Sequence, residues 1–214
     1  VCGVEPKEKL ALLAETEAAY RSLQRTKNAW LSVRRLTVRT PSPELDHYLS
    51  GWGVYQALAC RVLGRTSMYQ SGGAVGFRDQ LQDAVNLIAV EHGLARSQIL
   101  QSCRHQFAEG DVLHWWHMLP DGDHGVRTHC SDDLVWLPWA ICEYAEKTGD
   151  TALCDETAPW LTAPVLADGE NDRYAVFQQS ERESTVLEHG LAALEAAFGR
   201  GAGPHGLPLF GSGD

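Results

Sequence analysis

Apolar residues recur at helical spacing along much of this chain. Between residues 6 and 36, leucines interleave with charged side chains, which predicts an amphipathic and largely exposed helix. A break follows at residues 40–44, where Ser42 can cap a new helix and Pro43 suits its first position. Apolar residues at three- and four-residue spacing from Leu45 to Val62 then predict a long core helix.

Four further segments carry a helical pattern, and polar or glycine-rich stretches separate them. The predicted helices cover about residues 79–91, 95–107, 131–149 and 185–198. Ser131 and the capping-box pattern from Thr185 to Glu188 mark the starts of the last two. The stretches that we predict to be loops are residues 64–77, 109–130 and 155–183. Because strand patterns are scarce, the sequence predicts an all-α fold whose helices pair antiparallel through loops.

Composition narrows the classes of partner. The 214 residues are 44% hydrophobic, which suffices for one sizeable core, and their net charge is −10. This acidic balance argues against nucleic acid or an anionic membrane surface as the main partner, because phosphate contacts need Lys and Arg. No apolar stretch reaches eighteen residues, so no transmembrane helix is predicted. The chain opens on Val1 instead of Met, which indicates a piece of a longer protein.

The six cysteines form no Cys-x-x-Cys pair. Their spacing indicates neither a zinc site nor a disulfide scaffold. We therefore expect buried free thiols in a reducing compartment.

Three polar clusters lie where predicted helices begin. They are Arg78 with Asp79, residues 109–117 with His114 and Trp115, and Arg127 with Asp132 and Asp133. Arginine and carboxylate side chains bind vicinal hydroxyl groups, and a Trp ring offers a stacking face to a pyranose. The clusters therefore predict a carbohydrate site at one end of a helical bundle.

Each cluster also has a structural interpretation. Charged residues such as Asp132 and Asp133 are common in the first turn of a helix, where the helix dipole favours acids. A Trp pair such as residues 115–116 lies in a core more often than in a ligand platform. His114-x-x-His117 with Asp111 lacks a convincing set of ligands, so we assign no metal site. The glycine-rich segment before Phe77 lacks the Lys-Ser/Thr ending of a phosphate-binding loop, which argues against a nucleotide.

Four blocks of the sequence resemble glycoside hydrolase family 94. The longest runs from Arg65 to Asp83 (RTSMYQSGGAVGFRDQLQD) and resembles the hallmark segment of that family. Residues 109–117 (EGDVLHWWH), 125–133 (GVRTHCSDD) and 205–214 (HGLPLFGSGD) are similar to three further family blocks, in the same order. The resemblance extends from about residue 40 to the end. The Gln-Leu-Gln that follows Asp79 is most similar to the β-1,2-glucan branch of the family.

The resemblance implies a fold and a reaction. The fold would be a six-hairpin (α/α)6 barrel, with residues 41–214 as its incomplete N-terminal part and residues 1–40 as a helical linker. The reaction would be reversible, inverting phosphorolysis of a β-glucoside, with no cofactor and with inorganic phosphate as co-substrate. In this family phosphate attacks directly, and one carboxylic acid protonates the leaving oxygen. That general acid would follow Asp214, so the 214 residues alone are expected to be inactive.

The resemblance also assigns expected roles to residues. Asp79 would hold hydroxyl groups of the sugar in subsite −1, with Arg78 beside it, and Arg65 would lie near the phosphate. The other residues expected to line the substrate pocket are His114, Trp115, Arg127, Asp132 and Asp133.

The expected partners follow from the same family. They are a β-glucan or gluco-oligosaccharide, phosphate, and a membrane-embedded glycosyltransferase part of the same polypeptide. The chain itself would lie in the cytoplasm, at the inner face of the cell membrane. The alternative is a non-catalytic carbohydrate-binding domain or a vestigial fragment of a phosphorylase domain. Sugar binding without turnover would distinguish that alternative from the enzyme.

Overall fold

The computed structural model describes residues 16–33, 36–64, 73–119 and 121–209. The chain divides into two compact units, Val1–Trp52 and Gly53–Asp214. Among the described residues, no helix combines the length and the apolar character needed to cross a bilayer.

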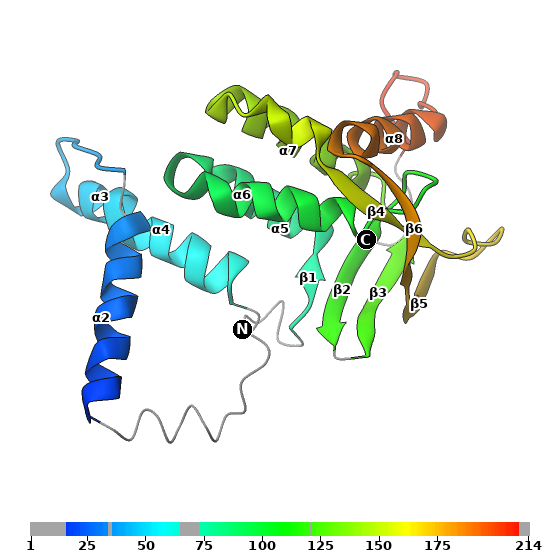
Figure 1. The fold of residues 1–214 in the computed structure, drawn as a ribbon. Helices are drawn as coiled ribbons and strands as arrows, with labels where there is room; N and C mark the ends of the chain where they lie inside the picture. The colour runs from blue at the N-terminus through cyan, green and yellow to red at the C-terminus, as the bar shows by residue number, and fades with distance from the viewer. Residues whose placement is uncertain (1–15, 34–35, 65–72, 120, 210–214) are drawn as a thin grey trace. The chain divides into compact units, whose positions relative to one another are not determined.

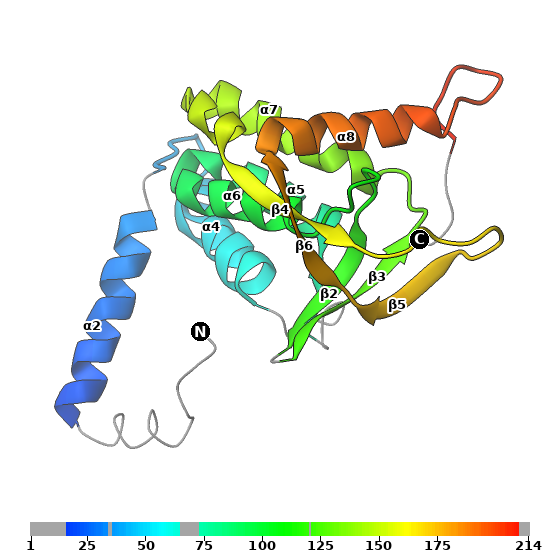
Figure 2. The same cartoon turned by 45° about the vertical axis from the view of Figure 1, so that its right-hand side comes forward.

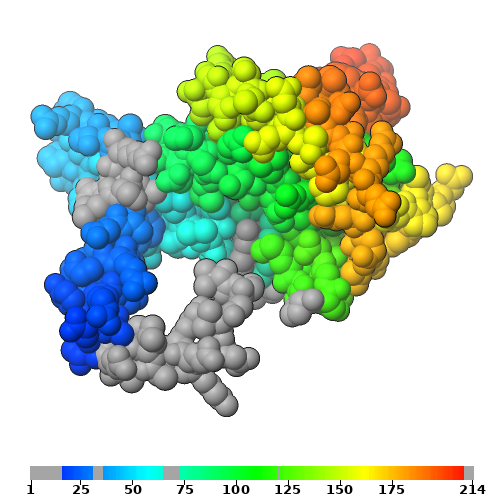
Figure 3. Space-filling view, viewed as in Figure 1, coloured from blue at the N-terminus to red at the C-terminus, as the bar shows by residue number. Residues whose placement is uncertain are grey.

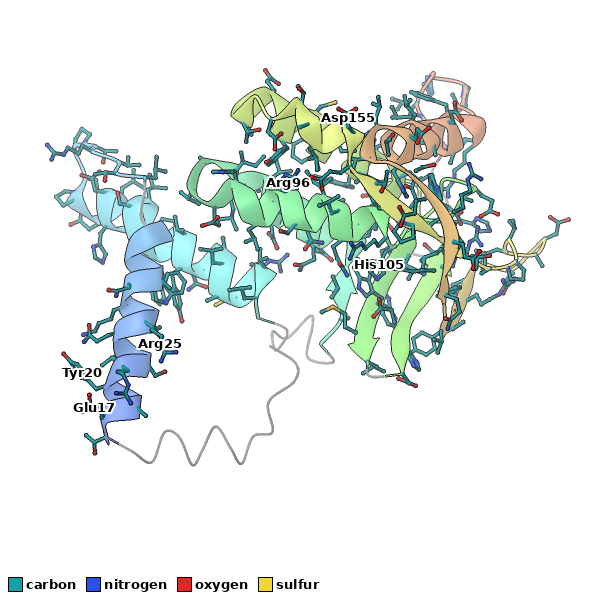
Figure 4. The ribbon with its side chains drawn as sticks, viewed as in Figure 1. Glu17, Tyr20, Arg25, Arg96, His105 and Asp155 are labelled. Atoms are coloured by element: carbon teal, nitrogen blue, oxygen red, sulfur yellow. The ribbon has the colours of Figure 1, made fainter. Side chains whose placement is uncertain are left out.

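The described part of the first unit consists of helices and the irregular segment 36–42. It contains α2 (Thr16–Val33), α3 (Pro43–His47) and η1 (Tyr48–Trp52). Tyr20 and other side chains of α2 are exposed, as the amphipathic pattern predicts (Figure 4). The predicted cap is confirmed, because the Ser42 hydroxyl accepts a bond from the Leu45 amide and Pro43 begins α3.

The predicted core helix between Leu45 and Val62 is only partly confirmed. The segment is helical, but it alternates between α- and π-type turns in α3, η1, α4 (Gly53–Tyr55) and η2 (Gln56–Val62). Leu58 and Val62 are buried, whereas the side chains at its start are exposed. The exposed residues are Leu45, Leu49 and Trp52. The core interpretation is therefore wrong for the first half of the segment, whose apolar side chains are exposed.

After α4 and η2, the second unit has helices near all four predicted positions, but the break between the first two lies at Leu87 and the short η3 (Thr151–Asp155) was not predicted. The four helices are α5 (Phe77–Asn86), α6 (Ile88–Cys103), α7 (Asp133–Thr148) and α8 (Val186–Gly199). The capping box that begins α8 at Thr185 is confirmed. The cap of α7 is corrected, since Asp132 and not Ser131 occupies that position, and it makes no side-chain capping bond.

Two antiparallel sheets contradict the predicted all-α fold, and with it the all-helical (α/α)6 barrel. One sheet has the order β1-β2-β3-β5, and the other pairs β4 with β6. The strands are β1 (Val75–Gly76), β2 (Leu113–Leu119), β3 (Gly122–Thr128), β4 (Thr157–Thr162), β5 (Asp172–Val176) and β6 (Gln178–Thr185). β1 falls in the predicted loop 64–77, and the other strands fall almost entirely in the two predicted loops after residue 108. There, His, Gly and charged residues obscure the alternation that marks a strand.

The core lies between the helices and the larger sheet. Phe77 and Leu81 of α5, Ile99 of α6 and Leu137 of α7 are almost completely buried, and Trp116 of β2 joins them from the sheet. In Figures 1 and 2, α7 and α8 run side by side above α5 and α6, and the space-filling view shows their surfaces adjoining (Figure 3). This packing brings the N-terminal ends of α5 and α7 close to β2.

Buried thiols are confirmed for only part of the cysteines. Cys103 and Cys130 are buried, whereas Cys60 and Cys142 are exposed. The described cysteines are all free.

Candidate functional site

An ion pair joins the beginnings of α5 and α7. Arg78, the second residue of α5, donates from Nη1 to Oδ2 of Asp132 at 2.7 Å. The two residues are 54 positions apart in sequence, and each side chain keeps about a third of its surface exposed. An exposed guanidinium with an adjacent carboxylate offers both donors and acceptors to a ligand.

The second element of the site is a hydrogen bond between β2 and α7. Nδ1 of His114 lies 2.7 Å from Oδ2 of Asp133, whose side chain is only 2% exposed. Burial raises the pKa of Asp133, and the bond to His114 only partly offsets this. The other oxygen of Asp133, Oδ1, is buried and has no hydrogen-bond partner among the described residues. Asp133 therefore fixes the orientation of the His114 ring.

Asp132 is electrostatically different from its neighbour. Burial acts to raise the pKa of Asp132, but hydrogen bonds from Arg78 and from the Cys130 thiol outweigh it, so the pKa is lowered. The thiol of Cys130 lies 3.1 Å from Oδ1 of Asp132. Burial and the two adjacent carboxylates raise the pKa of Cys130 to about 12, which keeps it a neutral thiol. Asp132 is thus a carboxylate near neutral pH, and Cys130 is unsuited to act as a nucleophile.

Asp79 lies in the first turn of α5, beside Arg78. Its Oδ1 is 4.0 Å from Nη2 of Arg61, which also donates from Nε to Asp83 at 2.9 Å. A Cβ atom at Gly76 would lie 2.4 Å from Oδ2 of Asp79, so glycine at this position makes room for the carboxylate. With 44% of its side chain exposed, Asp79 remains available to a ligand. Arg61 was not predicted as a site residue, because it lies on a separate helix, η2.

These residues form what we call the polar cluster. It consists of Arg78, Asp79, His114, Asp132 and Asp133. The sequence predicted seven residues of the substrate pocket, apart from Arg65 at the phosphate. Five of those seven belong to the polar cluster. Arg65 and Asp214 lie outside the described residues.

Trp115 lies elsewhere, on the larger sheet. Its ring contacts His117 at a centroid distance of 5.3 Å and Tyr174 of β5 at 5.7 Å. The β2–β3 pairing has a bulge between Leu113 and Trp115. A bulge changes the directions in which neighbouring side chains leave the strand. His114 therefore reaches α7, whereas Trp115 packs along the sheet.

Arg127 is completely buried and fully engaged by the protein. Nε and Nη2 donate to the two oxygens of Asp111 at 2.6 and 2.7 Å, and Nη2 also donates to Glu109. Nη1 donates to the carbonyls of Ala163 and Pro164. All five guanidinium N–H groups thus have protein acceptors. Arg127 joins β3 to the residues before β2 and to those after β4, and it has no donor left for a sugar.

The motif considered for a metal does not assemble. Asp111 is bonded to Arg127, and His117 packs against Trp115. A different group, His114, Cys130 and Asp133, has ligand atoms within 4.8 Å of one another. Two of these atoms are already joined by the His114–Asp133 hydrogen bond. This favours a hydrogen-bonded arrangement over a metal centre.

Comparisons with known proteins identify the family to which this chain belongs. The catalytic-domain model of the glycosyl hydrolase 94 superfamily matches residues 30–214, which include the whole polar cluster. The sequence is 44% identical over 177 residues to cyclic beta-(1,2)-glucan synthase NdvB of Rhizobium meliloti. It is 30% identical over 187 residues to N,N'-diacetylchitobiose phosphorylase of Vibrio proteolyticus, and 31% over 179 residues to solabiose phosphorylase of Paenibacillus borealis.

These matches cover most of this chain but little of each relative. They include 83%, 75% and 84% of the chain, respectively. The same matches span 6%, 21% and 19% of the length of the relatives. The chain is therefore similar to one section of much longer proteins.

Proposed function

Because this chain belongs to the glycosyl hydrolase 94 superfamily, we propose that it is part of a glycoside phosphorylase domain that acts on β-linked glucans. The similarity to two proteins named as phosphorylases supports the reaction class. The higher identity to a cyclic β-1,2-glucan synthase supports β-1,2-linked glucose as the substrate. Inorganic phosphate would be the co-substrate of an inverting phosphorolysis.

The observation that carries this proposal is the polar cluster. Arg78 presents N–H donors, while Asp79 and Asp132 present carboxylate acceptors from two adjoining helix starts. Neighbouring hydroxyl groups of a sugar both donate and accept hydrogen bonds, so such a mixed set can hold a glucose unit in one orientation. His114, held by Asp133, would add a ring nitrogen with a fixed direction.

The described residues would bind and orient the sugar. Phosphorolysis also requires a proton donor for the leaving glycosidic oxygen. Asp132 is unsuited to that role, because its lowered pKa keeps it ionised. We accordingly assign positioning of the sugar to the polar cluster, and we assign protonation to none of its members.

The cellular setting is part of the same proposal. Residues 41–214 would belong to the catalytic domain, and residues 1–40 would be a linker. A membrane-embedded glycosyltransferase part of the same polypeptide would be the partner, at the cytoplasmic face of the membrane. The match to 6% of the length of a glucan synthase supports only that this chain is one part of a larger polypeptide.

The test is phosphorolysis by the complete natural polypeptide that carries this chain. β-1,2-Gluco-oligosaccharides are incubated with phosphate, and the release of glucose 1-phosphate is measured. Asp79→Asn is expected to lower kcat/KM at least a hundredfold, because it removes a charged acceptor that would hold the reacting sugar. Asp155→Asn, the same change at an exposed site on η3, is the matched control and should leave the rate unchanged.

Three outcomes are informative. Release of glucose 1-phosphate that depends on Asp79 supports the proposal. Binding of the oligosaccharide with no turnover favours a carbohydrate-binding domain instead. An absence of both binding and turnover with β-linked glucans would overturn the proposal.

A further inference from the structure

Four rings form a continuous row across the larger sheet. His117 of β2 lies directly opposite His124 of β3, and Trp115 and Tyr174 both pair with Val126 from either side. Trp115 contacts His117 at 5.3 Å and Tyr174 at 5.7 Å, and Tyr174 contacts His124 at 6.2 Å between ring centroids. We call the surface formed by Trp115, His117, His124 and Tyr174 the aromatic face.

The four rings of this row are not part of the hydrophobic core. Side chains alternate between the two faces of a strand, and Trp116, the neighbour of Trp115, faces the core. Trp116 is completely buried and stacks on His105 at 3.8 Å; Figure 4 labels His105 near the junction of helices and sheet. On the aromatic face, by contrast, Tyr174 is 55% exposed and Val176 of the same strand is 40% exposed. The rings therefore lie on the solvent side of the sheet.

We propose that the aromatic face is a second carbohydrate site, which holds the distal part of a β-glucan chain by ring stacking. This inference rests on the proposed function. The flat C–H face of a pyranose packs against indole and phenol rings, whose polar edges can bond to its hydroxyl groups. The imidazole of His124, 3.1 Å from Asp121, adds a further polar group at the rim.

The charge of the aromatic face favours a neutral ligand. Its strand positions, including Val126 and Val176, carry no Lys or Arg. A nucleic acid could also stack on such rings, but it would need cationic partners for its phosphates, and the whole chain has a net charge of −10. An uncharged glucan meets no such requirement.

The aromatic face and the polar cluster both include a residue of β2. His114 and Trp115 are consecutive residues, so their Cα atoms are about 3.8 Å apart. The bulge at this point directs one residue to Asp133 and the other to Tyr174. Only a glucan long enough to pass from one face of the sheet to the other would engage both surfaces. The aromatic face would then make binding depend on chain length.

The test compares short and long substrates in the complete polypeptide. Tyr174→Ala is expected to weaken binding of long β-1,2-gluco-oligosaccharides about tenfold, because it removes one ring of the stacking row. Its affinity and rate for the disaccharide should be unchanged. Tyr20→Ala, which removes an equally exposed ring from α2, is the control and should change neither. Trp115→Ala tests the same row at its centre.

A second measurement needs no substitution. In the unaltered protein, titration with long oligosaccharides should shift the NMR signal of the Trp115 indole, whereas the disaccharide should not. If the protein phosphorolyses glucans but Tyr174→Ala binds long chains normally and this signal is unmoved, the inference fails and the proposed function stands. If long glucans bind through Tyr174 without any phosphorolysis, the inference stands and the proposed function fails. Binding of a protein partner at this face in place of glucan would also overturn the inference.

Discussion

The guanidinium of Arg127 and the carboxylate of Asp111 form a two-bond pair, at 2.6 and 2.7 Å, with the arginine fully shielded from solvent. The side chain also lies over the ring of Phe107, 3.8 Å from its centroid. Removing one member of a buried pair leaves the other charge uncompensated, which is far more costly than losing a surface pair.

We therefore expect Arg127→Met to lower the free energy of unfolding by about 3–5 kcal/mol. The control is Lys147→Met, which removes a half-exposed pair with Glu143 and should cost about 0.5 kcal/mol or less. Urea unfolding followed by circular dichroism measures both. Equal effects would show that Arg127 is not a structural residue and would return it to the list of candidate sugar ligands.

The buried carboxyl of Asp133 should make stability depend on pH in a particular direction. Its pKa is raised above 3.8, so the folded state holds this proton more tightly than the unfolded state does. The contribution of this group to stability is therefore present at low pH and is lost as pH rises through the raised pKa. Relative to Asp133→Asn, the wild-type chain should lose stability as the pH rises above about 4. A pH-independent difference between the two would contradict this assignment.

His189 should make stability depend on pH in the direction opposite to that of Asp133. It is completely buried against Trp160, at 3.7 Å, and burial lowers its pKa below 6.5. The folded state therefore binds this proton less tightly, and stability is lost as pH falls below about 6.5. Compared with His189→Gln, the wild type should lose up to about 1.4 kcal/mol per pH unit between pH 6.5 and 5.5. Parallel pH profiles for the two proteins would exclude His189 as the source.

Gly110 and Gly169 provide a matched pair for testing backbone packing. Both have positive φ angles, of 93° and 82°. A Cβ at Gly110 would lie 2.3 Å from the carbonyl oxygen of Ala192, whereas nothing lies within 4 Å of one at Gly169. Gly169→Ala should cost about 1–2 kcal/mol for the conformation alone. Gly110→Ala should cost clearly more, because α8 must also move; equal losses in urea unfolding would contradict the close contact.

Most helices of this chain are determined by local sequence. The capping box at Thr185 and the stop at Gly149 involve residues within four positions of one another, and both are confirmed. Ser131 shows the limit of such signals: its neighbour Asp132 takes the cap position, and Asp132 turns its carboxylate to Arg78 of another helix. A local rule cannot anticipate a partner 54 residues away.

The sheets were missed because their partners are distant in sequence. Arg127 of β3 pairs with Leu113 on one side and with Arg173 on the other. A strand such as β5, with a charged residue at its start and exposed ring and methyl groups along it, shows little pattern until its neighbour is known. The same holds for Arg61, whose position beside Asp79 depends on the packing of two helices.

The sequence by itself determined the family and most helices, because these depend on contiguous motifs, local periodicity and capping. Only the tertiary structure decided that the fold includes two sheets, that the buried Arg127 pairs with Asp111, and that Trp115 lies in a row of rings on the larger sheet. These features arise from pairing and burial between segments far apart in the chain. No single segment contains the groups that will desolvate or bond its side chains, so their roles follow only once the chain has folded.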